Sequence, residues 1–138
     1  IKQMIDGAQR AFQERNKSGF SFIDIPNNYR SSYEFLKNYF KTEKHDVIIT
    51  HRDSQALATI NAAQENKLLI PDQMEVICVI DTKYNAMVRP QLSAFAIPSY
   101  DLGAVAMRIM TKMLHDEILE DKEIELSYLF TPRQSTKI

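Results

Sequence analysis

The chain has 138 residues, of which 44% are hydrophobic and 25% are charged, the composition of one ordinary globular domain with a core of its own. Seventeen Lys and Arg side chains against eighteen Asp and Glu side chains leave a formal charge of −1. This balance argues against direct DNA binding by this chain and against attraction to an anionic membrane, because both need an excess of positive charge.

The single cysteine and the chain start bear on the cellular compartment. Cys78 excludes an internal disulfide, and its apolar setting in residues 76–80 is typical of a reduced, buried thiol. No apolar run approaches the length of a membrane span, and the chain starts with neither an initiator methionine at position 1 nor a secretory signal. We therefore expect a cytoplasmic protein and a chain that is part of a longer one.

The hydrophobic period switches repeatedly between about 3.6 and 2 residues, the pattern of an α/β fold. Ile5, Ala8 and Phe12 lie on one face of a predicted helix at the start of the chain. Residues 20–25 then alternate as a strand, and Pro26 ends it. The chain is thus expected to begin with a helix followed by a strand.

The middle of the chain repeats the unit of strand and helix. Ser31 and Glu34 have the spacing of a capping box, which predicts that a helix begins at Ser31. A strand is predicted over 46–50, a helix over 54–66, and a strand over 75–80. Strands separated by helices of this length predict right-handed crossovers and a mostly parallel sheet with helices on both faces.

The last part of the chain predicts one more helix and one more strand. The helix follows Pro98, with Ser99 as its expected N-cap, and residues 124–130 alternate as a closing strand. In a parallel sheet, ligands bind beyond the carboxyl ends of the strands. Here those ends are residues 25–29, 50–53 and 80–84.

Catalytic and metal-binding patterns are missing from the sequence. The three histidines, His45, His51 and His115, do not include a pair at helical spacing. Cys78 has apolar neighbours that make a thiol inert, and the acidic residues 116–125 lack the alternating ligands and glycine of a calcium loop. The three separated glycines form no phosphate-binding loop. We therefore expect no catalytic residue, no metal and no cofactor, and we predict that the protein is not an enzyme.

Several segments occur in the order found in one known protein family. Residues 46–50 and 53–58 are similar to a strand of that family and the helix that follows it, and 69–77 is similar to its Val-Pro-Glu-Asp-Val-Ser-Val-Val segment. Residues 89–93 are similar to its Arg-Pro-Pro-Leu-Thr element, and 98–103 is similar to the start of its last helix. The chain therefore resembles the transcription repressors of the lactose-repressor and galactose-repressor (LacI/GalR) family.

The resemblance implies a fold like that of the bacterial periplasmic sugar-binding proteins, in which a small effector sits between two lobes. Residues 1–138 would be the C-terminal part of this sensor domain, without the helix-turn-helix that binds operator DNA. The effector, a sugar, a sugar phosphate or another small metabolite, would set the angle between the lobes in a homodimer. Residues 99–130 would pack with the missing lobe, which would leave Leu102, Ile109 and Met113 exposed in this chain.

The resemblance also implies where the ligand-binding positions fall, and most of them are altered here. The usual Arg falls on Met4, the Asn of Asn-Asp on Arg52, and the first Asp of Gly-Phe-Asp-Asp on Ile80, whereas Asp53 and Asp81 are kept. Met4 and Ile80 cannot make the directed hydrogen bonds by which Arg and Asp recognise sugar hydroxyls.

Each remaining candidate has two interpretations. Arg52 favours a phosphate or carboxylate through charge-assisted pairing, or it is a surface cation at a helix start. Asp53 contacts the ligand, or it is a carboxylate that the helix dipole stabilises. Asn28 and Tyr29, at the mouth of the first strand, offer a polar and a stacking contact, although ordinary loop polarity explains them as well.

By the same resemblance, dimer contacts fall on the Ala-rich helix 56–63 and on segment 83–88. The candidate contact residues are Ala56, Ala63, Tyr84 and Val88. Small residues permit close approach of a second helix, but they are equally compatible with packing on the sheet.

Two other classes of protein remain open. A solute-binding protein of a sugar transport system would share the fold and the βα pattern. A small α/β enzyme would place its site at the same strand ends, although the sequence contains no pair of nucleophile and base to support it.

Overall fold

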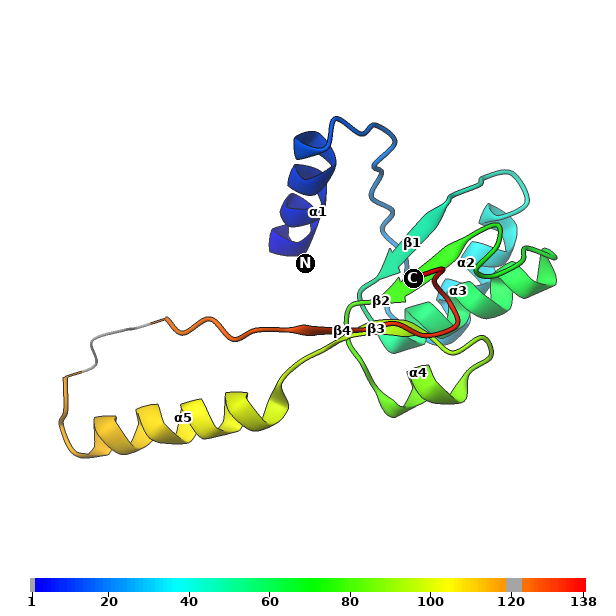
Figure 1. Ribbon diagram of the computed structural model, residues 1–138. Helices are drawn as coiled ribbons and strands as arrows, with labels where there is room; N and C mark the ends of the chain where they lie inside the picture. Colours follow the sequence, from blue (N-terminus) through cyan, green and yellow to red (C-terminus); the bar gives the residue numbers. More distant parts are fainter. Residues whose placement is uncertain (1, 119–122) are drawn as a thin grey trace.

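The computed structural model in Figure 1 describes residues 2–118 and 123–138. In chain order the elements are α1 (Lys2–Glu14), α2 (Tyr29–Tyr39), β1 (Val47–Thr50), α3 (Asp53–Glu65), β2 (Glu75–Cys78), α4 (Lys83–Met87), β3 (Ser93–Ala96), α5 (Ser99–Leu114) and β4 (Leu129–Thr131). Among the described residues, no helix is long and apolar enough to cross a bilayer.

The four strands form one sheet in the order β1-β2-β3-β4. The first three strands are parallel, and β4 pairs antiparallel with β3. The prediction of an α/β fold with a mostly parallel sheet is therefore confirmed. Helix α3 packs against β1 and β2 on one face, and α2 packs against α3. On β1, the side chains of Val47 and Ile49 lie on the face of the sheet opposite the buried Thr50, and they are about half exposed.

The core lies between the sheet and α3. Ile60 of α3 is fully buried, as are Val76 and Cys78 of β2, and Leu36 of α2 closes the cluster from the other side of α3. Ala56 and Ala63 are also fully buried. Small side chains on α3 let the helix approach its neighbours closely, so of the two interpretations of this helix, the structure favours packing within the chain.

The strand predicted over residues 20–25 is not formed, and this prediction is wrong for the described chain. The segment has no regular secondary structure and pairs with none of the described strands. Phe20 instead packs its ring against Phe12, with a centroid distance of 5.6 Å. An alternating sequence becomes a strand only where a neighbour supplies backbone hydrogen bonds, and the described strands form no such pairing with these residues.

Two predicted helix starts are also wrong by a few residues. Helix α2 begins at Tyr29 rather than Ser31, because Asn28 is the N-cap and its Oδ1 accepts a hydrogen bond of 2.9 Å from the Ser31 amide. Ser99 is the first residue of α5 rather than its cap. Its hydroxyl donates to the Ile97 carbonyl at 3.3 Å, and Pro98 occupies the cap position.

Helix α5 projects away from the sheet, to which β3 and β4 connect it (Figure 1). None of its residues is buried, although one face is apolar. Leu102 and Met113 are 52% and 61% exposed, as expected of a helix that lacks its packing partner, and Ile109 is half-buried.

Candidate functional site

The carboxyl ends of β1 and β2 lie side by side, because Thr50 pairs with Cys78 at the last position of both strands. This register brings Asp53, at the start of α3, next to the loop that follows β2. The Thr82 hydroxyl donates to Asp53 Oδ2 at 3.0 Å, which joins the two strand ends directly. The expectation that these two positions meet at one edge of the sheet follows from parallel pairing.

Asp53 has a structural role at this edge. Its Oδ1 accepts a hydrogen bond of 2.7 Å from the Ser54 amide, and Oδ2 accepts the bond from Thr82. Both oxygens keep a second lone pair for a ligand. A carboxylate in the first turn of α3 is also stabilised by the helix dipole, so the geometry is compatible with both interpretations of Asp53.

Asp81 is engaged by a residue that sequence reasoning did not include. The Arg133 guanidinium donates from Nη1 to Asp81 Oδ1 at 2.9 Å and from Nη2 to Oδ2 at 2.7 Å. The two side chains are only 17% and 18% exposed. Nothing in the sequence could have paired residues 52 positions apart. The carboxylate that the resemblance offers to a ligand is thus neutralised within the chain.

Buried polar groups gather behind this edge. The fully buried Asn85 donates from Nδ2 to the Ile80 carbonyl at 2.9 Å, and the Cys78 thiol donates to the same oxygen at 3.2 Å. Burial raises the pKa of Cys78, which keeps the thiol protonated and unreactive. Asn85 Oδ1 and His51 Nδ1 are buried without a hydrogen-bond partner in the described chain. Such atoms are rare, and a water or ligand would satisfy them.

Arg52 lies at the outer rim of the same edge. It is exposed and occupies the N-cap position of α3, where its side chain makes no capping hydrogen bond. The ion pairs found in the described chain do not include it. Its positive charge is therefore available to an anion that approaches the strand ends.

The other three predicted ligand positions lie elsewhere or contribute no polar group. Ile80 is at the edge, but only its carbonyl takes part in hydrogen bonds there. Met4 is on α1, which stands apart from the sheet (Figure 1). Asn28 caps α2, and its side-chain oxygen is used by that cap.

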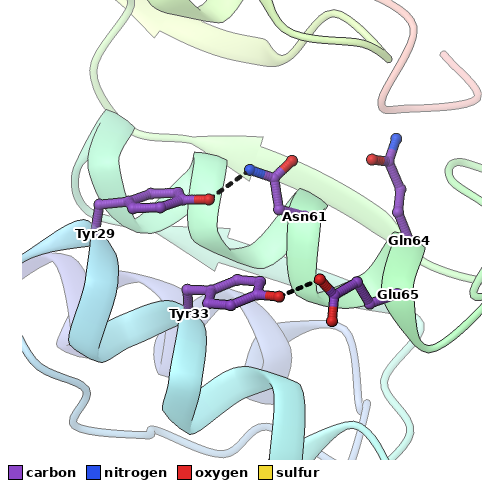
Figure 2. Close-up of a pocket in the computed structure, with 5 residues that line it drawn as sticks. All are labelled: Tyr29, Tyr33, Asn61, Gln64 and Glu65. Atoms are coloured by element: carbon purple, nitrogen blue, oxygen red, sulfur yellow. Dashed lines mark hydrogen bonds between the residues drawn. The ribbon is translucent and has the colours of Figure 1, made fainter.

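Tyr29 belongs to a separate hollow between α2 and α3, of about 400 Å³. Figure 2 shows the Tyr29 and Tyr33 rings lying side by side, stacked at a centroid distance of 6.0 Å. The Asn61 amide donates to the Tyr29 hydroxyl at 2.7 Å, and the Tyr33 hydroxyl donates to Glu65. The hollow is on the helical layer and not at the strand ends.

The charges beside this hollow are paired. Glu65 forms an ion pair of 2.8 Å with Lys37. The hydrogen bond from Lys37 holds the pKa of the Glu65 carboxyl below its usual range, and the Glu65 carboxylate raises the pKa of Tyr33. No cluster of His, Cys, Asp or Glu in the described ranges could hold a metal ion.

The predicted dimer positions divide into two groups. Ala56 and Ala63 are covered by this chain itself, so the structure corrects their assignment from surface to core. Tyr84 on α4 is about half exposed, and Val88, directly after α4, is half-buried. Of the four predicted contact positions, Tyr84 and Val88 are therefore the two that remain accessible to a partner.

Known proteins similar to this chain agree on its class. The family described as periplasmic binding protein-like domain matches residues 2–136. The HTH-type transcriptional regulator pepR1 of Lactobacillus delbrueckii subsp. lactis is 33% identical over 132 residues, which is 96% of this chain and 39% of that protein. Catabolite control protein A of Priestia megaterium is 40% identical over 110 residues, 79% of this chain and 33% of that protein.

A solved structure shows the same fold. The LacI family transcriptional regulator from Arthrobacter sp. FB24, in complex with lactose, has a TM-score of 0.81 at 20% identity, and the match covers 94% of this chain and 48% of that one. The chain thus spans about a third to two fifths of the curated relatives named above. The resemblance read from the sequence is confirmed: the chain belongs to the periplasmic binding protein-like domain family and is similar to transcription regulators of the LacI type.

Proposed function

We propose that the chain is the C-terminal sensor part of a cytoplasmic LacI-type repressor, which binds a small effector and thereby controls operator DNA through a helix-turn-helix outside this chain. The observation that carries the proposal is the joined edge formed by Asp53, Thr82 and Asp81 in a chain whose relatives are regulators. Two of the relatives are transcription regulators, which favours this function over that of a solute-binding protein of a sugar transport system.

The mechanism is a shift between two lobe arrangements. An effector changes DNA binding only if its affinity differs between the two arrangements. The strand ends of this chain supply one wall of the site, and the other lobe supplies the second wall. No chemical step is required of these residues, and we propose no enzymatic activity.

We propose a homodimer in which the α4 segment contributes contacts. Tyr84 and Val88 carry this proposal, because they are the two predicted contact residues that this chain does not fully cover. Exposed aromatic side chains are common anchors of protein interfaces.

For the effector, we propose a sugar phosphate or another small anion. Met4 and Ile80 offer apolar side chains where the family has Arg and Asp, and Arg133 already neutralises Asp81. Arg52 then supplies the charge at the edge that is open to a ligand. A guanidinium pairs with phosphate or carboxylate in a bidentate manner, which a neutral sugar cannot match.

The test is calorimetric titration of the full-length regulator with neutral sugars, sugar phosphates and small carboxylates. We expect Arg52→Ala to weaken binding of the anionic ligand by about 10- to 100-fold, the loss of one hydrogen-bonded charge pair. Lys41→Ala, which removes an exposed cation at the end of α2, is the matched control and should leave the affinity unchanged.

Two results would contradict the proposal that the effector is an anion. Tight binding of a neutral sugar that Arg52→Ala does not change would assign recognition to other residues. No binding across the panel, together with intact operator binding, would indicate a regulator that works without a small effector.

We also propose that residues 99–130 pack with the lobe outside this chain. The described part of this segment includes α5, whose apolar face is uncovered here. An exposed apolar face along a helix of this length normally marks an interaction surface.

Hydrogen exchange of α5 tests this packing. We expect the amides of 102–113 to exchange at least about tenfold more slowly in the full-length regulator than in the 138-residue chain, because packing suppresses local opening. The amides of α3, which is buried here, serve as the internal reference. Equal exchange of α5 in the two proteins would mean that the helix stays exposed.

A further inference from the structure

At the candidate site, Asp81 contacts β3 directly and contacts the residues just after β4 through Arg133. The chain leaves the sheet through β3 and returns through β4, and Phe95 pairs with Phe130 between them. The Asp81 backbone amide donates to the Phe95 carbonyl on β3 at 2.9 Å. Its carboxylate binds Arg133, which follows β4 by two residues.

Arg133 is held in place from several sides. Besides its two bonds to Asp81, its Nη1 donates to the Leu92 carbonyl at 2.6 Å. Its backbone amide donates to the Ser93 hydroxyl at 2.8 Å, and Ser93 is fully buried at the start of β3. The guanidinium is therefore a fixed anchor between the ends of the two connecting strands and not a mobile surface group.

Asp81 is equally bound to the loop at the strand ends. Its neighbour Thr82 donates to Asp53, and its other neighbour Ile80 accepts from the buried Asn85. Thr82 directly follows Asp81 in the chain, so a displacement of the Thr82 backbone on ligand binding carries Asp81 with it. The movement reaches β3 through the Asp81 amide and β4 through Arg133.

We propose that the pair Asp81–Arg133, here called the latch, couples the proposed effector site at the carboxyl ends of β1 and β2 to β3 and β4, the two strands that connect the sheet to α5. Arg133 is a positioning residue that acts through Asp81 and does not contact the ligand. Two parallel charge-assisted bonds at low exposure give the latch a defined geometry, so loop and strands move together. This inference rests on the proposed function, in which the lobe angle carries the signal.

The test measures the distance between α2 and α5, which changes with the angle between the lobes, in the absence of any effector. Spin labels are attached to Glu34→Cys on α2 and Lys112→Cys on α5, both exposed positions, in the full-length regulator. The buried Cys78 is not labelled by a short treatment. Labelled protein is diluted with unlabelled protein so that distances between subunits are rare. The width of the distance distribution is compared for the native residues, Asp81→Asn and Arg133→Lys.

We expect either substitution to broaden the distribution about twofold, and the double variant to broaden it no further, because both act on one interaction. Glu65→Gln, which removes the ion pair on α2 and α3, should leave the width unchanged. Hydrogen exchange in 79–82 and 93–97 verifies that the latch is broken, with an expected acceleration of about tenfold.

Faster exchange with an unchanged distribution would overturn the proposal, since the latch would then only stabilise the fold. Broadening by Glu65→Gln to the same extent would also overturn it, because the effect would not be specific to the latch. Arg133→Lys keeps the charge, and thermal unfolding checks that it remains folded. Since no effector is used, this result is independent of the ligand panel that tests the proposed function.

Discussion

Replacing Ile60 with alanine is expected to lower the free energy of unfolding by about 2–5 kcal/mol, the range for a large aliphatic side chain removed from a packed core. Ile60 is fully buried on α3, within the cluster that joins α2 to the sheet. Its neighbours belong to a helix and a strand and can relax only partly into the cavity. Urea unfolding followed by circular dichroism measures the loss.

The matched control is Leu69→Ala in the turn before β2, where the leucine is 60% exposed. We expect this change to stay within about 0.5 kcal/mol, as for most surface substitutions. Since single domains are stable by only about 5–15 kcal/mol, the loss at Ile60 would be a large part of the total. Similar losses for the two variants would mean that the core is not where the structure places it.

Replacing Arg133 with methionine is expected to cost about 1.5–3 kcal/mol, the range for hydrogen bonds to a charged group. Removal leaves the Asp81 carboxylate at 18% exposure without its partner. A fully buried pair would lose more, but residual solvent contact weakens the penalty here. The change in unfolding free energy, measured as for Ile60, tests this expectation.

The second ion pair of the described chain provides a matched control. Lys37 and Glu65 are 42% and 48% exposed, and exposed pairs contribute little because water and salt screen them. Lys37→Met is therefore expected to leave stability nearly unchanged. If Lys37→Met destabilised the protein as much as Arg133→Met, burial would not be what distinguishes the two pairs.

Local patterns predicted most of the regular structure. The periodic apolar residues of α1, α3 and α5 and the apolar runs of β1 and β2 were enough to place these elements. The short elements α4 and β3 were not predicted, because five and four residues carry too little periodicity. The predicted strand at 20–25 failed because strand formation depends on a partner, which no local pattern reveals.

The candidate site was predicted only in part. Asp53 and the loop after β2 were expected to meet, because parallel strands align their carboxyl ends. Arg133 was not expected, and neither was the cap made by Asn28. Asn28 and Ser31 are both residue types that cap a helix well, and only the path of the chain decides which of them is the cap.

By itself, the sequence determined the α/β class, the family and the residue types at the strand ends, because periodicity and ordered motifs are local properties of the chain. Only the tertiary structure decided how those residues are used. It buried Ala56 and Ala63 against the chain's own core and paired Asp81 with Arg133. The physical reason is that burial and charge pairing depend on which distant residues the fold brings within contact, and separation along the chain does not encode that distance.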